Sequence, residues 1–200
     1  MTGLMVKIEE AHRGLEGWAD LKKAHTLAAI VIALRPETVL EVGVYGGKSF
    51  LPMALACKEV GRGMCYAVDP WQTEASVAEQ PKEHADHWGK VDHEKIYNGF
   101  MEAVRKLGVA HRVRVLRQKS DDVDLSKFQS IELLSIDGNH GPQALRDVKR
   151  FCPLVPVGGI CVLDDLDWPQ VVPAENWILA NGFVKLYPLG TGAVYSRKSL

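Results

Sequence analysis

Short apolar runs of strand length alternate with segments of helical period along most of this 200-residue chain, and this alternation restricts the possible folds more than any other feature. The strand-length runs are 38–44, 64–69, 112–118, 131–137 and 160–165, and the helical segments lie near 15–34, 49–60, 96–107, 142–151 and 174–181. Because parallel strands are joined by crossover connections that are usually helices, the pattern predicts an α/β doubly wound, mostly parallel sheet with helices on both faces.

The end of the chain departs from this alternation. The runs FVKLYPL and GAVYSR follow one another and are separated by Gly190 and Thr191. Two strand-like runs joined by two residues that include a glycine are typical of a β-hairpin. We therefore expect the last strand to run antiparallel to the rest of the sheet.

The length of the chain suits a single domain, residues 1–200, because a chain of this size builds one hydrophobic core. We distinguish an N-terminal helical segment, 1–35, and a polar, lid-like insertion, 72–92, which is the one long irregular connection. The chain has 24 basic and 25 acidic side chains, so no excess of positive charge points to nucleic acid. No apolar run has the length of a signal peptide or a membrane span. We expect a cytoplasmic protein with a small-molecule partner, and the sequence leaves a homo-oligomer open.

The segment EVGVYGGKS, residues 41–49, contains a glycine-rich loop directly after the first predicted strand. A phosphate-binding loop needs four residues between its first glycine and the Gly-Lys-Ser triplet, and only three follow Gly43. A dinucleotide fingerprint needs a second glycine where Tyr45 stands. S-adenosylmethionine has no phosphates and needs only a tight turn that lets the backbone approach the ligand. The acidic Glu41 before the turn also suits a cationic ligand, so the loop favours S-adenosylmethionine over a nucleotide.

The second predicted strand ends at Asp69, where a carboxylate at the strand tip can accept hydrogen bonds from both hydroxyls of a ribose. Pro70 and Trp71 follow directly, and we expect the indole of Trp71 to cover a face of the adenine. Together with the glycine loop, this strand end predicts a site for a cofactor that contains adenosine.

Four motifs, VLEVGVYGGKS, YAVDPW, LLSIDGNH and PVGGICVLDDLDWP, follow one another in an order and spacing that resemble class I S-adenosylmethionine-dependent methyltransferases. More narrowly, they resemble the small bacterial metal-dependent O-methyltransferases related to the catechol and antibiotic-sugar enzymes, over about residues 37–197. The resemblance implies a Rossmann-like, seven-stranded sheet with an antiparallel last strand. It also implies that the cofactor is lined by Gly43, Tyr45, Gly46 and Ser49, with its ribose at Asp69 and its adenine near Ser120.

Three carboxylates are expected to meet at the carboxyl ends of adjacent strands, the edge where open parallel sheets bind their ligands. Asp137 follows the fourth strand, and Asp164 and Asp165 follow the fifth. Acids so close together repel one another unless a cation lies between them, and oxygen ligands suit Mg²⁺. In related metal-dependent O-methyltransferases, acids in these positions hold the ion that gathers and activates the acceptor hydroxyl. We expect Asp137, Asp164 and Asp165 to bind Mg²⁺, with turn structure or substrate hydrogen bonding as the alternative.

Two polar residues follow the first of these acids. Asn139 stands where several relatives carry an acid thought to serve as a metal ligand or general base, and an amide cannot take up a proton at neutral pH. His140 is the neighbouring side chain whose ordinary pKa suits proton transfer. Asp137 and His140 are therefore the catalytic candidates, and a cap or a supporting hydrogen bond is the alternative role of His140. Asp167 and Trp168 are secondary candidates for the acceptor pocket.

The insertion 72–92 carries His84 and His87, with His93 just beyond it, and these residue types suit zinc. A solvated helix that closes over the site is the simpler interpretation, because the segment is rich in charged residues, and Trp88 would then supply its apolar part.

The predicted function is transfer of a methyl group from S-adenosylmethionine to a hydroxyl of a small molecule, with a divalent metal ion positioning the acceptor. Two other classes stay open at this point. A nucleotide hydrolase or kinase would use Lys48 on a phosphate, and a non-catalytic module would bind S-adenosylmethionine without transferring its methyl group.

Overall fold

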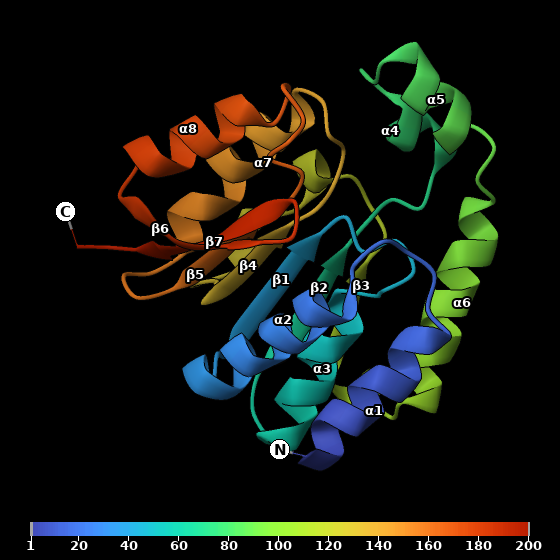
Figure 1. The fold of residues 1–200 in the computed structure, drawn as a ribbon, viewed down its shortest axis with the longest axis vertical. Helices are drawn as coiled ribbons and strands as arrows, with labels where there is room; N and C mark the ends of the chain where they lie inside the picture. The colour runs from blue at the N-terminus through green and yellow to red at the C-terminus, as the bar shows by residue number, and fades with distance from the viewer. Residues whose placement is uncertain (1, 200) are drawn as a thin grey trace.

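The computed structural model describes residues 2–199, and within this range seven strands form one sheet in the order β3-β2-β1-β4-β5-β7-β6 (Figure 1). The strands are β1 (Thr38–Val42), β2 (Met64–Val68), β3 (Val113–Leu116), β4 (Leu133–Ile136), β5 (Ile160–Leu163), β6 (Phe183–Leu189) and β7 (Gly192–Arg197). The helices are α1 (Thr2–Arg13), α2 (Leu21–Leu34), α3 (Phe50–Glu59), α4 (Thr73–Val77), α5 (Lys82–Trp88), α6 (His93–Lys106), α7 (Gln143–Phe151) and α8 (Val172–Ala180), and short 3₁₀ turns lie at Ala110–Arg112, Ser120–Asp122, Leu125–Lys127 and Cys152–Leu154. No helix within residues 2–199 is long and apolar enough to cross a membrane.

The pairing of the strands confirms the expected topology. Strands β1 to β5 pair in parallel, which requires the crossover connections that the sequence pattern predicted. Strand β7 is antiparallel to both β5 and β6, and Gly190 adopts a positive φ of 63° in the turn between β6 and β7. The Rossmann-like, doubly wound sheet with an antiparallel last strand is therefore present.

Alternating residues of the strands serve two separate cores, one on each face of the sheet. In β1, Val39 packs in a core with α1, α2, α3 and α6, whereas its neighbour Leu40 packs in a core with α7 and α8. This division follows from the strand geometry, because successive side chains point to opposite faces. Figure 1 shows α7 and α8 together on one side of the sheet and α2 and α3 together on the other.

The N-terminal segment forms two helices, α1 and α2, whereas the sequence pattern predicted one helix beginning near Leu15. Gly17, between α1 and α2, has a φ of 129°, which favours glycine and interrupts the helix. The Asp20 side chain then caps α2 by accepting a hydrogen bond from the backbone N–H of Lys23 at 2.6 Å. The cap fixes the beginning of α2 and places its first turn in the wall of the cavity described below.

The insertion 72–92, where the sequence indicated a long irregular connection that carries a solvated helix, contains the two short helices α4 and α5. Pro81 precedes α5, which is a favourable position for proline because the first helical N–H groups have no partner within the helix. Figure 1 shows α4 and α5 beyond the carboxyl ends of the central strands. The insertion therefore lies at the edge of the sheet where the candidate site residues gather.

Candidate active site

A cavity of about 790 Å³ opens at the carboxyl ends of β1, β2, β4 and β5. The first turn of α2 and residues of the insertion 72–92 complete its walls. The expected site residues that line it are Gly43, Tyr45, Ser49, Asp69, Ser120, Asp137, His140, Asp164 and Asp165. Three further expected site residues, Glu41, Gly46 and Trp71, are not among the described residues in its wall.

The glycine loop packs directly on the end of β4. Gly43 has a φ of 84°, and a Cβ atom there would lie 2.1 Å from the carbonyl oxygen of Asp137. Only glycine permits this approach, so the loop and the acid cluster are held together at the cavity. Gly46 packs elsewhere, because a Cβ atom there would lie 2.4 Å from the carbonyl oxygen of Glu16, in the segment before α2. This packing requires glycine at position 46, and the contact of Gly46 with a cofactor stays a prediction.

Lys48 is not placed as in a phosphate-binding loop, where the lysine ammonium faces the phosphates. Its Nζ donates a hydrogen bond to the backbone carbonyl oxygen of Gly17 at 3.2 Å. This contact ties the glycine loop to the segment before α2. The arrangement does not favour a nucleotide hydrolase or kinase.

Asp69 joins the chain segments that follow β1 and β2. Its Oδ2 accepts a hydrogen bond from the backbone N–H of Tyr45 at 2.9 Å, and its Oδ1 accepts one from the backbone N–H of Trp71 at 2.7 Å. Burial raises the pKa of Asp69, and the backbone donors oppose that rise. A carboxylate has about four lone-pair sites, so both oxygens retain capacity for the hydroxyl groups of a ligand.

Trp71 does not have the position that the sequence analysis expected. It is 2% exposed, and its ring stacks on Phe100 with ring centroids 5.5 Å apart. Its Nε1 donates a hydrogen bond to the carbonyl oxygen of Tyr45 at 2.9 Å. A φ of 45° at Trp71 accompanies this inward turn of the chain. The indole therefore supports the glycine loop from the core and does not offer a face to an adenine in the cavity.

Glu41 is 0% exposed and lies below the wall of the cavity. Ser135 Oγ donates a hydrogen bond to its Oε1 at 3.0 Å, and Oε2 has no hydrogen-bond partner among the described residues. Burial, with the nearby Asp137 carboxylate, raises the pKa of Glu41 to about 8. Because Glu41 has no exposed surface and does not line the cavity in the described structure, its position does not support the expected direct role at the cofactor.

Ser120 belongs to a buried polar group between the end of β3 and α7. Gln143 Nε2 donates hydrogen bonds to Ser120 Oγ at 3.1 Å and to Asp147 Oδ1 at 2.9 Å. Burial raises the pKa of Asp147 to about 6. These contacts hold Ser120 in the wall of the cavity.

A lysine that the sequence analysis did not single out lies among the three acids. Lys23 donates hydrogen bonds through Nζ to Asp137 Oδ2 at 2.7 Å and to Asp164 Oδ2. Burial alone would lower the pKa of Lys23, but the two carboxylates hold that pKa well above its ordinary value, so the ammonium stays charged. Burial raises the pKa of Asp137 to about 7. At Asp164 the effect of burial is outweighed by Lys23, which lowers the pKa of that carboxyl.

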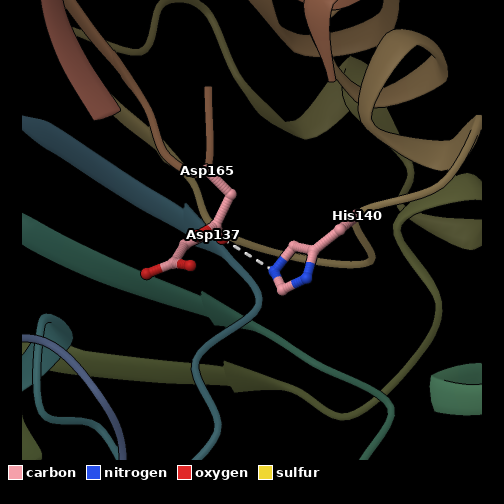
Figure 2. A group of neighbouring side chains, drawn as sticks. All are labelled: Asp137, His140 and Asp165. Carbon is pink, nitrogen blue, oxygen red and sulfur yellow. Dashed lines mark ion pairs between the residues drawn. The ribbon is translucent and has the colours of Figure 1, made fainter. Parts of the chain in front are cut away.

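The expected set of magnesium ligands is not formed by these side chains. Asp164 is engaged by Lys23 and by Thr191, whose Oγ1 donates to Asp164 Oδ1 at 3.0 Å. Within residues 2–199, the group of three potential ligands whose atoms lie within 4.8 Å of one another is Asp137, His140 and Asp165 (Figure 2). Mg²⁺ prefers oxygen ligands, whereas an imidazole nitrogen suits zinc and other transition metals. The residues therefore do not fit a magnesium ion held by three carboxylates.

The imidazole of His140 is paired with one of the acids (Figure 2). Its Nε2 lies 2.7 Å from Asp165 Oδ2, and its Nδ1 is buried without a hydrogen-bond partner among the described residues. Burial lowers the pKa of His140, but the neighbouring carboxylates, Asp165 first, raise it more, so the net shift is upward. Asp165 thus orients the ring, and no other described residue bonds to Nδ1.

The side chain of Asn139 forms hydrogen bonds to the insertion and to the following turn. Its Nδ2 donates hydrogen bonds to the carbonyl oxygens of Ala78 at 2.9 Å and Ala75 at 3.4 Å, and its Oδ1 accepts one from the N–H of Gly141 at 2.8 Å. A carboxylate at this position would face two carbonyl oxygens without a proton to donate. The amide therefore matches its surroundings.

Aromatic rings form part of the cavity on the side of the insertion. Trp88 lies with its ring centroid 5.3 Å from that of Trp18 and 5.8 Å from that of Tyr45. Trp168 contacts His84 and His140, with centroids 4.3 and 4.6 Å away. The three histidines considered for zinc, His84, His87 and His93, lie near aromatic rings and do not form a metal-ligand group within the described residues. Asp167, the other secondary candidate, is exposed and does not line the cavity in the described structure.

Comparisons with known proteins found one matching family model and several solved structures of similar fold. A family model described as a methyltransferase domain matches residues 40–166. A search of curated proteins found no match. Among solved structures, the O-methyltransferase NovP is similar with a TM-score of 0.73 and 18% identity, over 90% of this chain and 81% of that chain. The O-methyltransferase TomG from Streptomyces achromogenes, solved with S-adenosylmethionine, has a TM-score of 0.66 and 14% identity, over 98% of this chain and 90% of that chain. The O-methyltransferase from Bacillus cereus, solved with S-adenosylhomocysteine, has a TM-score of 0.62 and 13% identity, over 98% and 91%. At these identities the likeness shows the fold.

Proposed function

The chain belongs to a family of methyltransferase domains, which confirms the S-adenosylmethionine-dependent methyltransferase expected from its motifs, and we propose that the methyl acceptor is a hydroxyl oxygen of a small molecule. One observation carries this proposal: a single cavity is lined by both the glycine loop with Asp69 and the paired His140 and Asp165. A site for the methyl donor and a group that can accept a proton therefore share one space, as direct transfer to an oxygen atom requires.

In this proposal the cofactor lies along the carboxyl ends of β1 and β2. Asp69 accepts hydrogen bonds from the ribose hydroxyls, the chain at Gly43 and Tyr45 borders the methionine part, and Ser49 lies beside it. Ser120 lies near the adenine. Two observations support this placement of the cofactor. These residues line the same cavity, and both oxygens of Asp69 keep lone pairs for a ligand.

The acceptor oxygen then attacks the methyl carbon in line with the sulfonium. A carbon–oxygen bond forms as the carbon–sulfur bond breaks, and the electron pair stays on sulfur to give S-adenosylhomocysteine. The hydroxyl proton passes to the imidazole of His140, which Asp165 holds in place. A protonated imidazole cannot accept this proton, so the rate rises with pH through the raised pKa of His140. No step uses magnesium, because the residues do not fit its expected ligand set.

The aromatic residues of the wall indicate the shape of the acceptor. Trp168 lies against His140, and Trp88 lies against Trp18 and Tyr45. Flat aromatic faces bind planar rings well by stacking and edge contacts. We therefore propose a hydroxyl group on a planar ring as the acceptor.

The proposal is tested by measuring S-adenosylhomocysteine formation from S-adenosylmethionine with a panel of phenols and aliphatic alcohols. We expect turnover with phenols, and we expect His140→Gln to lower kcat by about 10² to 10⁴ while the cofactor Kd stays unchanged. The control is His111→Gln, which changes an exposed imidazole outside the cavity and should turn over like the wild type. Cofactor binding without turnover on any acceptor would favour the non-catalytic module, and an unchanged kcat in His140→Gln would remove the base assignment.

A further inference from the structure

Lys23 is a buried cation whose position is fixed by the helix that carries it. The residue is 4% exposed, and it lies on the buried stripe of α2 with Leu27 and Val31, at steps of four residues. Its own backbone N–H is the donor that Asp20 uses to cap α2. The cap and the stripe together direct the side chain from the first turn of the helix to the ends of β4 and β5.

A divalent ion that bridged the same two carboxylates would need the space that this ammonium occupies. Nζ bonds to Oδ2 of Asp137 and Oδ2 of Asp164, the two oxygens that face one another across the gap between strand ends. Mg²⁺ binds its oxygen ligands at about 2.0–2.1 Å, so it would lie between the same atoms. A second cation beside the ammonium would also be repelled by it.

We propose that Lys23 takes the place of a divalent metal ion between Asp137 and Asp164, so that this protein transfers methyl groups without a metal ion at that position. Its role in the reaction rests on the function proposed above. An ammonium carries three N–H donors, and the bonds to Asp137 and Asp164 use two of them. Lys23 lines the cavity, so the third donor serves the acceptor oxygen and stabilises the negative charge that develops there as the proton leaves for His140.

The cation role is tested on the protein alone, with Mn²⁺ as a probe followed by electron paramagnetic resonance and Mg²⁺ followed by calorimetry. The wild type should bind neither ion below millimolar concentrations. Lys23→Ala leaves Asp137 and Asp164 without a cation between them and should bind Mn²⁺ at least tenfold more tightly than the wild type. The control, Lys22→Ala, removes the same charge from the adjacent exposed position and should behave like the wild type.

Two results would overturn the proposal: micromolar, stoichiometric binding of Mn²⁺ to the wild type, or no gain of Mn²⁺ binding in folded Lys23→Ala. If Lys23→Ala does not fold, Lys23→Met replaces it, because methionine fills a similar volume without charge. The titration of the wild type needs no variant, because micromolar binding of Mn²⁺ to the wild type would by itself overturn the proposal.

The role in catalysis is tested once an acceptor has been found. A chelator should leave the wild-type rate unchanged, and Lys23→Met should lower kcat by about 100-fold without changing the Kd of S-adenosylhomocysteine. Lys23→Arg, which keeps the charge, should recover part of the loss. If hydroxyl methylation is found and a chelator abolishes it, the proposed function stands and this inference fails. If no hydroxyl is methylated but Lys23→Ala gains an Mn²⁺ site, the assignment of the cation stands and the proposed function fails.

Discussion

At the scale of single residues, buried carboxyl groups make the stability of this protein depend on pH. Glu41 is fully buried, one of its oxygens has no hydrogen-bond partner within residues 2–199, and burial raises its pKa to about 8. In the unfolded chain this carboxyl has an ordinary pKa near 4.5. The folded state therefore keeps a proton that the unfolded chain has lost. The resulting contribution to stability is fully present below the ordinary pKa and is lost as the pH rises toward 8.

We predict that Glu41→Gln removes this part of the pH dependence. Between the ordinary pKa of Glu41 and its raised pKa in the folded state, each pH unit lowers the unfolding free energy of the wild type by about 1.4 kcal/mol. The unfolding free energy of the variant relative to that of the wild type should therefore rise from about pH 5 to pH 8. Urea unfolding across this pH range measures the difference in unfolding free energy. In the control Glu37→Gln, at an exposed carboxyl, the unfolding free energy should change with pH as it does in the wild type. A difference between Glu41→Gln and wild type that is the same at every pH would contradict the assignment.

The pair of His140 and Asp165 carries a second prediction at this scale. Asp165 is the main carboxylate that raises the pKa of His140, so Asp165→Asn should lower that pKa. Because the neutral imidazole is the active form, the rising limb of kcat/KM against pH should move to lower pH, while the maximal rate falls for lack of orientation. Asp167→Asn, at an exposed position two residues on, should leave both the limb and the rate unchanged. If the rising limb of kcat/KM against pH does not move in Asp165→Asn, a group other than His140 controls the pH dependence.

At the scale of elements, a few polar contacts hold the insertion over the cavity. Asn139 binds two carbonyl oxygens of the insertion, and Arg146 of α7 pairs with Glu79. Both partners of the ion pair are about half exposed, so the pair adds little to global stability. The insertion is thus attached by contacts that can open without unfolding the sheet.

We predict that Asn139→Asp loosens the insertion, because its carboxylate would face the carbonyl oxygens of Ala75 and Ala78. Trypsin should cleave faster at Lys82 and Lys90, while the global unfolding free energy should change by less than about 1 kcal/mol. The matched control, Asn98→Asp, makes the same change at an exposed position of α6. Equal cleavage rates in Asn139→Asp and wild type would mean that the amide does not hold the insertion.

The strands and their order were open to prediction from sequence, because buried parallel strands are continuous apolar runs and their carboxyl ends share one edge. The same rule predicted the sheet edge at which Asp137, Asp164 and Asp165 lie, and all three line the cavity. The position of Trp71 was not predictable, because stacking on Phe100 outweighs its closeness in sequence to Asp69. Lys23 did leave a signal, since it is a lysine in register with buried positions of α2. Its two partners, however, lie 114 and 141 residues away, and no local pattern identifies them.

At the scale of the whole molecule, the cavity lies where the strand order reverses, between the half that runs outward through β2 and β3 and the half that runs through β4 and β5. Such a reversal opens a crevice at the carboxyl ends of the strands, where open α/β sheets bind ligands. Gly43 closes the bottom of this crevice by contact with the end of β4. The fold therefore places the expected cofactor side and the acid cluster next to one another without any further element.

The position of Asp69 at the cofactor side of this crevice leads to a prediction about cofactor affinity. Asp69→Asn keeps the size of the side chain but replaces one acceptor oxygen by a donor, so the affinity for S-adenosylhomocysteine should fall at least tenfold, or about 1.4 kcal/mol. Asp122→Asn, at an exposed position outside the cavity, should bind like the wild type. Thermal unfolding checks that the glycine loop, which Asp69 also holds, remains in place. Equal affinity in Asp69→Asn and wild type would remove the ribose assignment.

The measurement to make first is a calorimetric titration of the wild-type protein with S-adenosylhomocysteine and, separately, with ATP and Mg²⁺. We predict one molecule of S-adenosylhomocysteine bound per chain with micromolar Kd and no heat from ATP. Binding of ATP that is lost in Lys48→Ala, without binding of S-adenosylhomocysteine, would contradict the assignment of the cavity and return the glycine loop to a phosphate-binding role.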